Sequence, residues 1–226
     1  MKALTYRSLQ DVRVETVPDP VVMQDDDILL RVTATAICGS DLHIYRGKIP
    51  DMKRGETLGP EFMGAGRGVT QRRKGDRVAV PVTICCGQCY FCSKSMFAAC
   101  ETTDPERGVI LDKKNVRADA GLFSYSHRYG GYAGGRAEFL RVPQADIGPM
   151  VIPVRLADEQ VLFLSRTLPA GYQAAVNAEV GARSTVEILG AELVGLMAAS
   201  CRLLSAERIL MVRSSLQASL GMRVRW

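Results

Sequence analysis

Four cysteines that stand close together constrain this chain more than any other feature. Cys86, Cys89, Cys92 and Cys100 follow the spacing C-x2-C-x2-C-x7-C. Four thiolates at such spacing are typical of a closed tetrahedral zinc site, which has no open position for a substrate. The alternative is a pair of disulfides, but bridges across two-residue gaps have poor geometry, and nothing in the sequence indicates an oxidising compartment. We therefore predict a structural zinc ion here, with the adjacent Cys85 as a packed thiol.

The bulk properties of the chain are those of a globular protein. Its 226 residues, 47% of them hydrophobic, suffice for one large domain or two small ones. The net charge of +5 is spread over interspersed acids and bases, and the tight basic cluster at residues 72–74 is interpreted as a turn. No apolar signal region opens the chain, and the longest apolar stretch, residues 193–201, is about half of a membrane span. We therefore expect a cytoplasmic protein with no nucleic-acid or membrane partner.

The first part of the chain shows the alternation of apolar and polar residues that is typical of β-strands. Strands are predicted at residues 3–6, 12–17, 28–36, 77–82 and 137–142. They imply a β-rich barrel into which a cysteine-rich lobe, at about residues 85–101, is inserted. We assign residues 1–153 to this domain.

After Pro153 the pattern changes to helices that alternate with strands. Asp158 is predicted to cap a helix that begins at Glu159, and Pro169 is predicted to break or kink it. A strand, a helix and a second strand then form one parallel βαβ unit, at residues 185–190, 193–204 and 208–212. We assign residues 154–226 to this part, so the fold class is mixed, α+β with an α/β segment.

Several motifs together resemble the zinc-containing medium-chain alcohol dehydrogenases, most closely their formaldehyde dehydrogenase-like branch. Besides the four cysteines, they occupy residues 37–43, 58–61, 74–78, 134–139 and 161–175. The similarity extends over residues 1 to about 213. It implies a GroES-like barrel domain that carries two zinc ions, followed by a Rossmann domain that binds NAD(P). The implied reaction is hydride transfer between NAD(P) and a small alcohol or aldehyde.

The resemblance also indicates where the second, catalytic zinc would be held. In the family this ion is a Lewis acid that polarises the alcohol oxygen while hydride passes to nicotinamide. Cys38 matches its cysteine ligand, but Pro60 replaces the histidine ligand and Arg166 replaces the aspartate ligand. Neither replacement can ligate a cation. We therefore expect Cys38, with Glu61 behind the metal position, to be the remnant of a catalytic zinc site.

Other residues near that remnant also match the family pattern. Ser40 and His43 match the proton relay, in which a hydroxyl takes the substrate proton and an imidazole passes it to water. The alternative for His43 is a surface or capping histidine. Asp41 matches the acid that supports a metal ligand, and His127 is expected in a loop without a role.

The dinucleotide-binding motif is only partly present. The pattern Gly-x-Gly-x-x-Gly retains Gly190 and Gly195, but Glu192 replaces the middle glycine and brings a negative charge towards the pyrophosphate position. Arg213 stands where an NAD-dependent enzyme keeps an acid, which could alternatively indicate NADP. Glu187 is unexpected in a central parallel strand, which should be continuously apolar.

Three hypotheses for the function follow. The chain is an active zinc- and NAD(P)-dependent alcohol or aldehyde dehydrogenase, or a truncated remnant with one structural zinc and little or no hydride transfer, or an interaction module that pairs with a full-length relative. We expect the remnant, because the losses fall on the ligands of the catalytic zinc and on the cofactor motif. Residues 216–226 do not resemble the family, and the Rossmann sheet is incomplete. An uncovered sheet edge favours homo-oligomers or aggregation.

Overall fold

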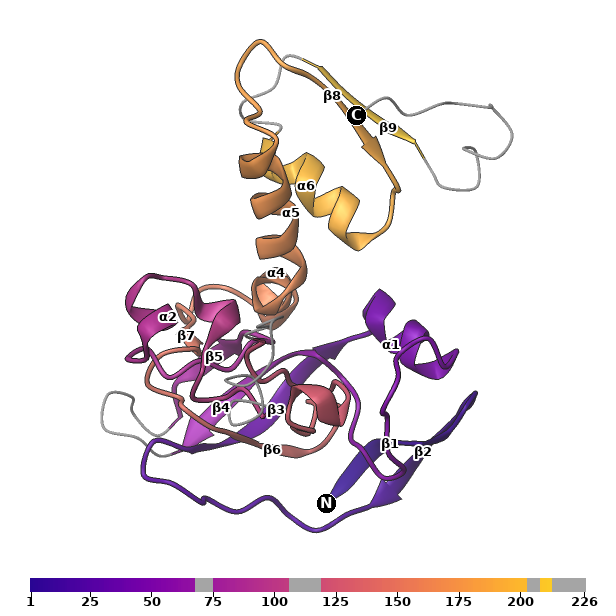
Figure 1. Ribbon diagram of the computed structural model, residues 1–226, viewed down its shortest axis with the longest axis vertical. Coiled ribbons are helices and arrows are strands. Elements are labelled where there is room, and N and C mark those ends of the chain that lie inside the picture. The colour runs from indigo at the N-terminus through magenta and orange to yellow at the C-terminus, as the bar shows by residue number, and fades with distance from the viewer. Residues whose placement is uncertain (68–74, 106–118, 203–207, 213–226) are drawn as a thin grey trace, which may run out of the picture. The chain divides into compact units, whose positions relative to one another are not determined.

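The computed structural model describes residues 1–67, 75–105, 119–202 and 208–212 (Figure 1). The chain divides into two compact units, Met1–Ser165 and Arg166–Trp226. The short helices α4 (Asp158–Val161) and η3 (Leu162–Ser165) therefore belong to the first unit. Among the described residues, no helix has both the length and the apolar character that a membrane crossing requires.

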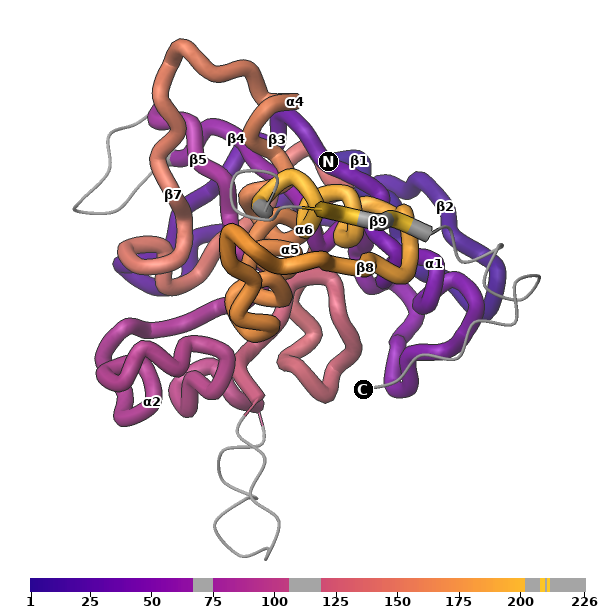
Figure 2. The backbone as a smooth tube through the Cα atoms, turned by 90° about the horizontal axis from the view of Figure 1, so that it is seen from above, coloured from indigo at the N-terminus to yellow at the C-terminus, as the bar shows by residue number. Residues whose placement is uncertain are grey.

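A five-stranded antiparallel sheet organises the first unit. Its strands, in spatial order, are β6 (Phe139–Val142), β3 (Ile28–Ala36), β4 (Glu61–Arg67), β5 (Arg77–Val80) and β7 (Met150–Val151). A separate antiparallel pair consists of β1 (Lys2–Ser8) and β2 (Asp11–Thr16). Within this unit, β1 and β2 lie on the opposite side from the lobe that contains α2 (Tyr90–Ser93), as Figures 1 and 2 both show. The predicted β-rich domain is confirmed.

Strand β4 was not among the predicted strands, because its glycines interrupt the apolar alternation. The structure shows why Gly64 is needed. A Cβ atom at Gly64 would lie 2.1 Å from the carbonyl oxygen of Arg31. This close approach occurs beside the irregularity between Val32 and Ala34, where β3 shifts its register against β4.

The two faces of the sheet carry separate apolar cores, because successive strand residues point to opposite sides. Phe62 is fully buried in one core and meets the Phe123 ring edge to face, with the ring centroids 5.2 Å apart. Its neighbour Met63 is buried in the other core, against Val161 and Leu162. This packing explains why α4 and η3 fold with the first unit. The predicted cap was wrong by one residue: Ala157 caps α4, and Asp158 is its first helical residue.

The second unit contains α5 (Thr167–Asn177), β8 (Thr185–Leu189), α6 (Leu193–Arg202) and β9 (Arg208–Val212). Strands β8 and β9 pair in parallel, so the predicted βαβ unit is confirmed. Pro169 does not break the helix, because it is the third residue of α5, where the backbone N–H has no intrahelical acceptor. Gly171 allows the two helices to pack closely, since a Cβ atom there would lie 2.6 Å from the nitrogen of Ala198.

Candidate functional site

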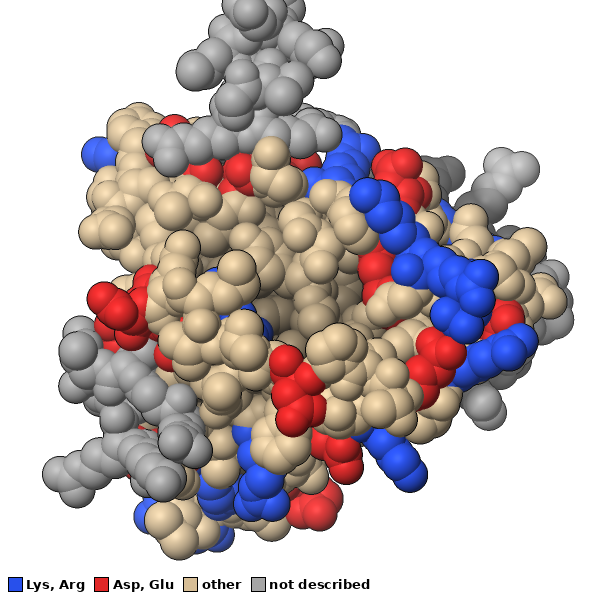
Figure 3. All heavy atoms as spheres, turned by 90° about the horizontal axis from the view of Figure 1, so that it is seen from below, with Lys and Arg blue, Asp and Glu red and all other residues tan. Residues whose placement is uncertain are grey.

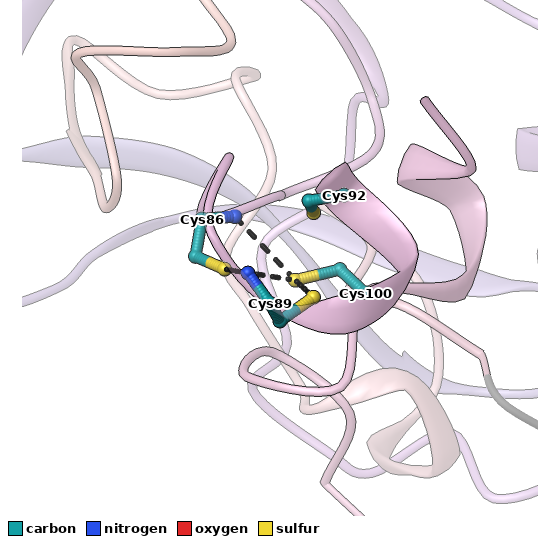
Figure 4. Close-up of side chains that lie close together, drawn as sticks. All are labelled: Cys86, Cys89, Cys92 and Cys100. Atoms are coloured by element: carbon teal, nitrogen blue, oxygen red, sulfur yellow. Dashed lines mark hydrogen bonds between the residues drawn. The ribbon is translucent and has the colours of Figure 1, made fainter. Parts of the chain in front are cut away.

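The structure brings the four predicted cysteines together in the inserted lobe. Cys86 precedes a turn at Gly87, which has a φ of +74°, and Cys89 caps α2. Cys92 lies within α2, and Cys100 follows the single turn η1 (Phe97–Ala99). All four sulfur atoms lie within 4.8 Å of one another and face a common centre (Figure 4).

The distances between the sulfurs fit a tetrahedral metal site. The Sγ of Cys100 lies 3.7 Å from that of Cys86 and 3.9 Å from that of Cys89. Thiolates at about 2.3 Å from a tetrahedral zinc ion are roughly 3.8 Å apart. All seven cysteines lie in the described part of the chain and all are free, so the disulfide alternative is not what the structure contains. Among the described residues, these four form the only group of three or more potential metal ligands.

Backbone N–H groups around the cluster favour negative charge on the sulfurs. The N–H of Cys86 donates to the Sγ of Cys100, and the N–H of Cys89 donates to the Sγ of Cys86, each at 3.4 Å. Burial acts to raise the pKa of Cys89, but hydrogen bonds led by those from the backbone of Cys92 and Glu101 outweigh it and lower the pKa to about 6. Burial raises the pKa of Cys92 to about 12, and a bound cation would oppose that effect.

Residues around the cluster connect the lobe to the rest of the unit. The hydroxyl of Thr103 donates to the carbonyl of Ile84 at 2.7 Å and accepts from the N–H of Gly121 at 3.1 Å. Burial, with smaller contributions from the neighbouring cysteines, raises the pKa of Cys85 to about 11. Cys85 is therefore a neutral packed thiol beside the ligand set.

Cys38 lies between β3 and the short helix α1 (Gly39–Tyr45), which it caps. Its half-buried Sγ is 3.9 Å from the Oγ of Ser40. Its backbone N–H donates to the Oδ2 of Asp41 at 2.7 Å, an interaction typical of a helix start. His43 is exposed on α1. The cysteine and the first relay residue are thus neighbours.

The residues at the ligand positions that the resemblance assigns do not fit a catalytic zinc ion. Pro60 is buried at the place of the expected histidine, and Glu61 begins β4 with a fully buried side chain. Arg166 belongs to the second unit, where it caps α5. No group of three potential ligands that includes Cys38 exists among the described residues. We therefore derive no chemistry through a zinc ion at this place.

A cation of the chain itself lies beside Cys38. A guanidinium nitrogen of Arg136 is 2.7 Å from the Oδ2 of Asp41 and 2.7 Å from the carbonyl oxygen of Ala36. The side chains of Arg136 and Asp41 are only 11% and 6% exposed. Sequence reasoning gave Arg136 no role, although it stands in one of the motifs that carried the resemblance. The sequence feature that could have indicated a role for Arg136 is its position as a charged residue between a glycine pair and an apolar strand.

In the second unit, two glycines of the dinucleotide motif have backbone roles. Gly190 has a φ of +111°, and a Cβ atom at Gly195 would lie 2.0 Å from the carbonyl oxygen of Gly190. They provide the turn and the close helix–strand approach that this motif requires. Glu192 and Glu187 are both exposed, and Arg213 lies outside the described residues.

His127, to which no role was assigned, contacts a buried carboxylate. It lies in the turn η2 (His127–Tyr129), and its Nδ1 contacts the carboxylate of Glu56, which makes an ion pair when the histidine is protonated. The pair lines a surface pocket of about 350 Å³ together with Lys53 and Tyr132. Burial outweighs the hydrogen bonds to Glu56 and raises its pKa. On the face of the molecule that Figure 3 shows, basic side chains lie beside acidic ones.

Comparison with known proteins agrees with this architecture. Residues 24–153 match the model of the alcohol dehydrogenase GroES-like domain. The uncharacterized zinc-type alcohol dehydrogenase-like protein AdhB of Bacillus subtilis (strain 168) is 40% identical over 220 residues, which cover 94% of this chain and 55% of that protein. A glutathione-independent formaldehyde dehydrogenase of Pseudomonas aeruginosa (strain LESB58) is 37% identical over 220 residues, 91% of this chain and 52% of that protein.

The solved structure of alcohol dehydrogenase TADH from Thermus sp. ATN1 superposes with a TM-score of 0.82 at 32% identity, covering 98% of this chain and 62% of that one. This chain belongs to the zinc-containing medium-chain alcohol dehydrogenase family, and the predicted family is confirmed. It spans about half the length of the curated relatives it matches.

Proposed function

We propose that this chain holds one zinc ion at its four-cysteine cluster and carries out no zinc-dependent hydride transfer. The supporting observation is a contrast between two places in the first unit. The sulfurs of the cluster converge within 4.8 Å, whereas Cys38 belongs to no group of three potential metal ligands among the described residues. Pro60 and Arg166 stand where the family resemblance expects the other two ligands.

A zinc ion at the cluster would act as a structural cross-link. Four thiolates leave no open coordination position, so such an ion binds neither substrate nor water. Among the described residues, the apolar cluster of the lobe contains one buried residue besides its cysteines, namely Ala120. Metal binding is worth about 10–16 kcal/mol in zinc-finger peptides, which is ample for a small lobe. Four reduced cysteines also support a thiol-reducing compartment such as the cytoplasm.

The second candidate is an active dehydrogenase for a small alcohol or aldehyde with NAD(P). Cys38 beside Ser40 and the backbone roles of Gly190 and Gly195 favour it. A relay at Ser40 and His43 would need a Lewis acid to acidify the alcohol, and the residues present do not supply one. Glu192 would also oppose the pyrophosphate of the cofactor.

The test is the zinc content per chain, measured by elemental mass spectrometry after dialysis against a mild chelator. We expect about one zinc in the wild type and in Cys38→Ser, and almost none in Cys100→Ser. Cys201→Ser, in the second unit, is the matched control. Two zinc ions in the wild type that fall to one in Cys38→Ser would instead favour the dehydrogenase, and alcohol-dependent reduction of NAD(P) would then be assayed.

A further inference from the structure

Two parts of the first unit that are remote in sequence meet at Asp41. Its Oδ2 accepts hydrogen bonds from the backbone N–H of Cys38 and from the guanidinium of Arg136, both at 2.7 Å. The same guanidinium nitrogen donates to the carbonyl of Ala36 at 2.7 Å. One cation therefore joins the last residue of β3 to the first turn of α1, on both sides of Cys38.

Arg136 itself is held firmly by the backbone. Its N–H donates to the carbonyl of Leu58 and its carbonyl accepts from the N–H of Leu4, both at 2.8 Å. A Cβ atom at Gly59, whose φ is +103°, would lie 2.6 Å from the Cγ of Arg136. The arginine stem thus packs directly on the glycine that precedes Pro60. Because the guanidinium is already fixed in this way, it loses little conformational entropy when it donates its hydrogen bonds.

A buried carboxylate needs such a partner. Asp41 is almost completely buried, and an ionised carboxylate removed from water is costly unless it is paired. In metal sites, carboxylates of this kind accept the second N–H of a ligating histidine. Pro60 has no N–H to donate. Arg136 supplies the missing positive charge from within the chain.

We propose that Arg136 is a positioning residue: its guanidinium holds the turn from Cys38 to Asp41 in place without a metal ion. It fixes the backbone on both sides of Cys38, so the environment of this thiol is independent of zinc. The proposal rests on the proposed function in one respect, namely that no zinc is bound at Cys38.

The same unit offers a matched control. Arg141 pairs with the fully buried Asp27, with nitrogen–oxygen distances of 2.6 and 3.1 Å. Asp27 in turn accepts from the N–H groups of Met23 and Gln24. Replacing Arg141 removes a buried ion pair of the same type and leaves every contact of α1 intact.

The experiment is the alkylation rate of Cys38 by iodoacetamide in the folded full chain, followed by peptide mass spectrometry. Cys201 is the internal reference. We expect Arg136→Met to react about tenfold faster at Cys38, because the turn opens locally. Arg136→Lys should keep part of the protection of Cys38 from alkylation. The ammonium retains the positive charge but cannot replace the planar hydrogen-bonding geometry of the guanidinium. Arg141→Met should stay within about twofold of the wild type, because distant sites are nearly independent.

The outcomes separate the proposal from the proposed function. Equal acceleration by Arg136→Met and Arg141→Met would show a general loss of stability and overturn the positioning role. Added zinc chloride that protects Cys38 in the wild type, with two zinc ions per chain, would refute the proposed function itself. If Arg136→Met does not fold, Arg136→Lys and Asp41→Asn decide: both should accelerate alkylation of Cys38, and unchanged rates would overturn the proposal.

Discussion

The Arg136 guanidinium and the Asp41 carboxylate are 2.7 Å apart, although they are separated by 95 positions in the sequence. This pair fixes the start of α1, and the Arg141–Asp27 pair fixes the turn before β3. Both ends of β3 are therefore connected to ion pairs whose carboxylates are almost completely buried. The first unit thus positions Cys38 by fixed charges of the chain, while its sulfur cluster lies in a separate lobe.

The adjacent residues Cys85 and Cys86 are assigned different roles, a packed thiol and a zinc ligand, and their variants should therefore differ. We expect Cys86→Ser to lose the zinc ion and to lower the melting temperature strongly, because metal binding is coupled to folding of the lobe. Cys85→Ser should keep about one zinc per chain and lose only about 1–3 kcal/mol, the cost of burying a hydroxyl. Zinc analysis and calorimetry of the two variants provide the measurement. Equal loss of zinc in both would contradict the assignment of the ligands.

The ionisation of Asp27 should make the free energy of unfolding depend on pH. Burial acts to raise its pKa, but the bonds from Arg141 and from the N–H groups of Met23 and Gln24 outweigh this and lower it. A depressed pKa stabilises the fold above the unfolded-state value near 3.8, and that stability is lost as the pH falls through the folded-state pKa.

We therefore expect Asp27→Asn to lose about 1–3 kcal/mol at pH 7. The difference from the wild type should shrink towards zero as the pH falls below about 3.8. Urea unfolding across this range measures it. Asp11→Asn is the control, since its partner Arg13 is exposed and such pairs contribute little. A difference for Asp27→Asn that is constant with pH would contradict the argument.

Gly64 should be irreplaceable by alanine. Its Cβ would lie 2.1 Å from a backbone oxygen of β3, which cannot move without disrupting the sheet. We expect Gly64→Ala to lose about 3 kcal/mol or more, as overpacked interiors do. Gly66→Ala, in the same strand, would meet only the flexible Cδ1 of Ile28 at 3.1 Å and should lose clearly less. Chemical unfolding of both variants tests this; similar losses would contradict the role of the backbone contact.

The sequence predicted those features that depend on local spacing. The cysteine cluster, β3 and the parallel βαβ unit are each encoded within a short segment, by ligand spacing or by apolar periodicity. The features that were missed depend on contacts between distant segments. Strand β4 was hidden by Gly64, whose reason is an oxygen of β3, and the pairing of Arg136 with Asp41 joins a loop to a helix. Pro169 was misread because a helix tolerates a proline in its first turn, where the backbone N–H has no intrahelical acceptor.

The sharpest test of the missing catalytic ligands is to restore them. The family resemblance assigns the three ligands to positions 38, 60 and 166, so we expect Pro60→His combined with Arg166→Asp to raise the zinc content from about one to about two per chain. The Oδ1 of Asp41 has no hydrogen-bond partner among the described residues and so remains available to a donor such as a ligating imidazole.

Each single variant should remain at about one zinc, since two protein ligands hold the ion only weakly. Adding Cys38→Ser to the double variant should remove the second zinc but leave the first, which identifies its place. Cobalt substitution gives an independent readout, because a site with one thiolate absorbs differently from one with four. A double variant that stays at one zinc would mean that Arg136, already bound to Asp41, keeps the place closed to a metal ion. Arg136→Met in the same background would then be expected to open it.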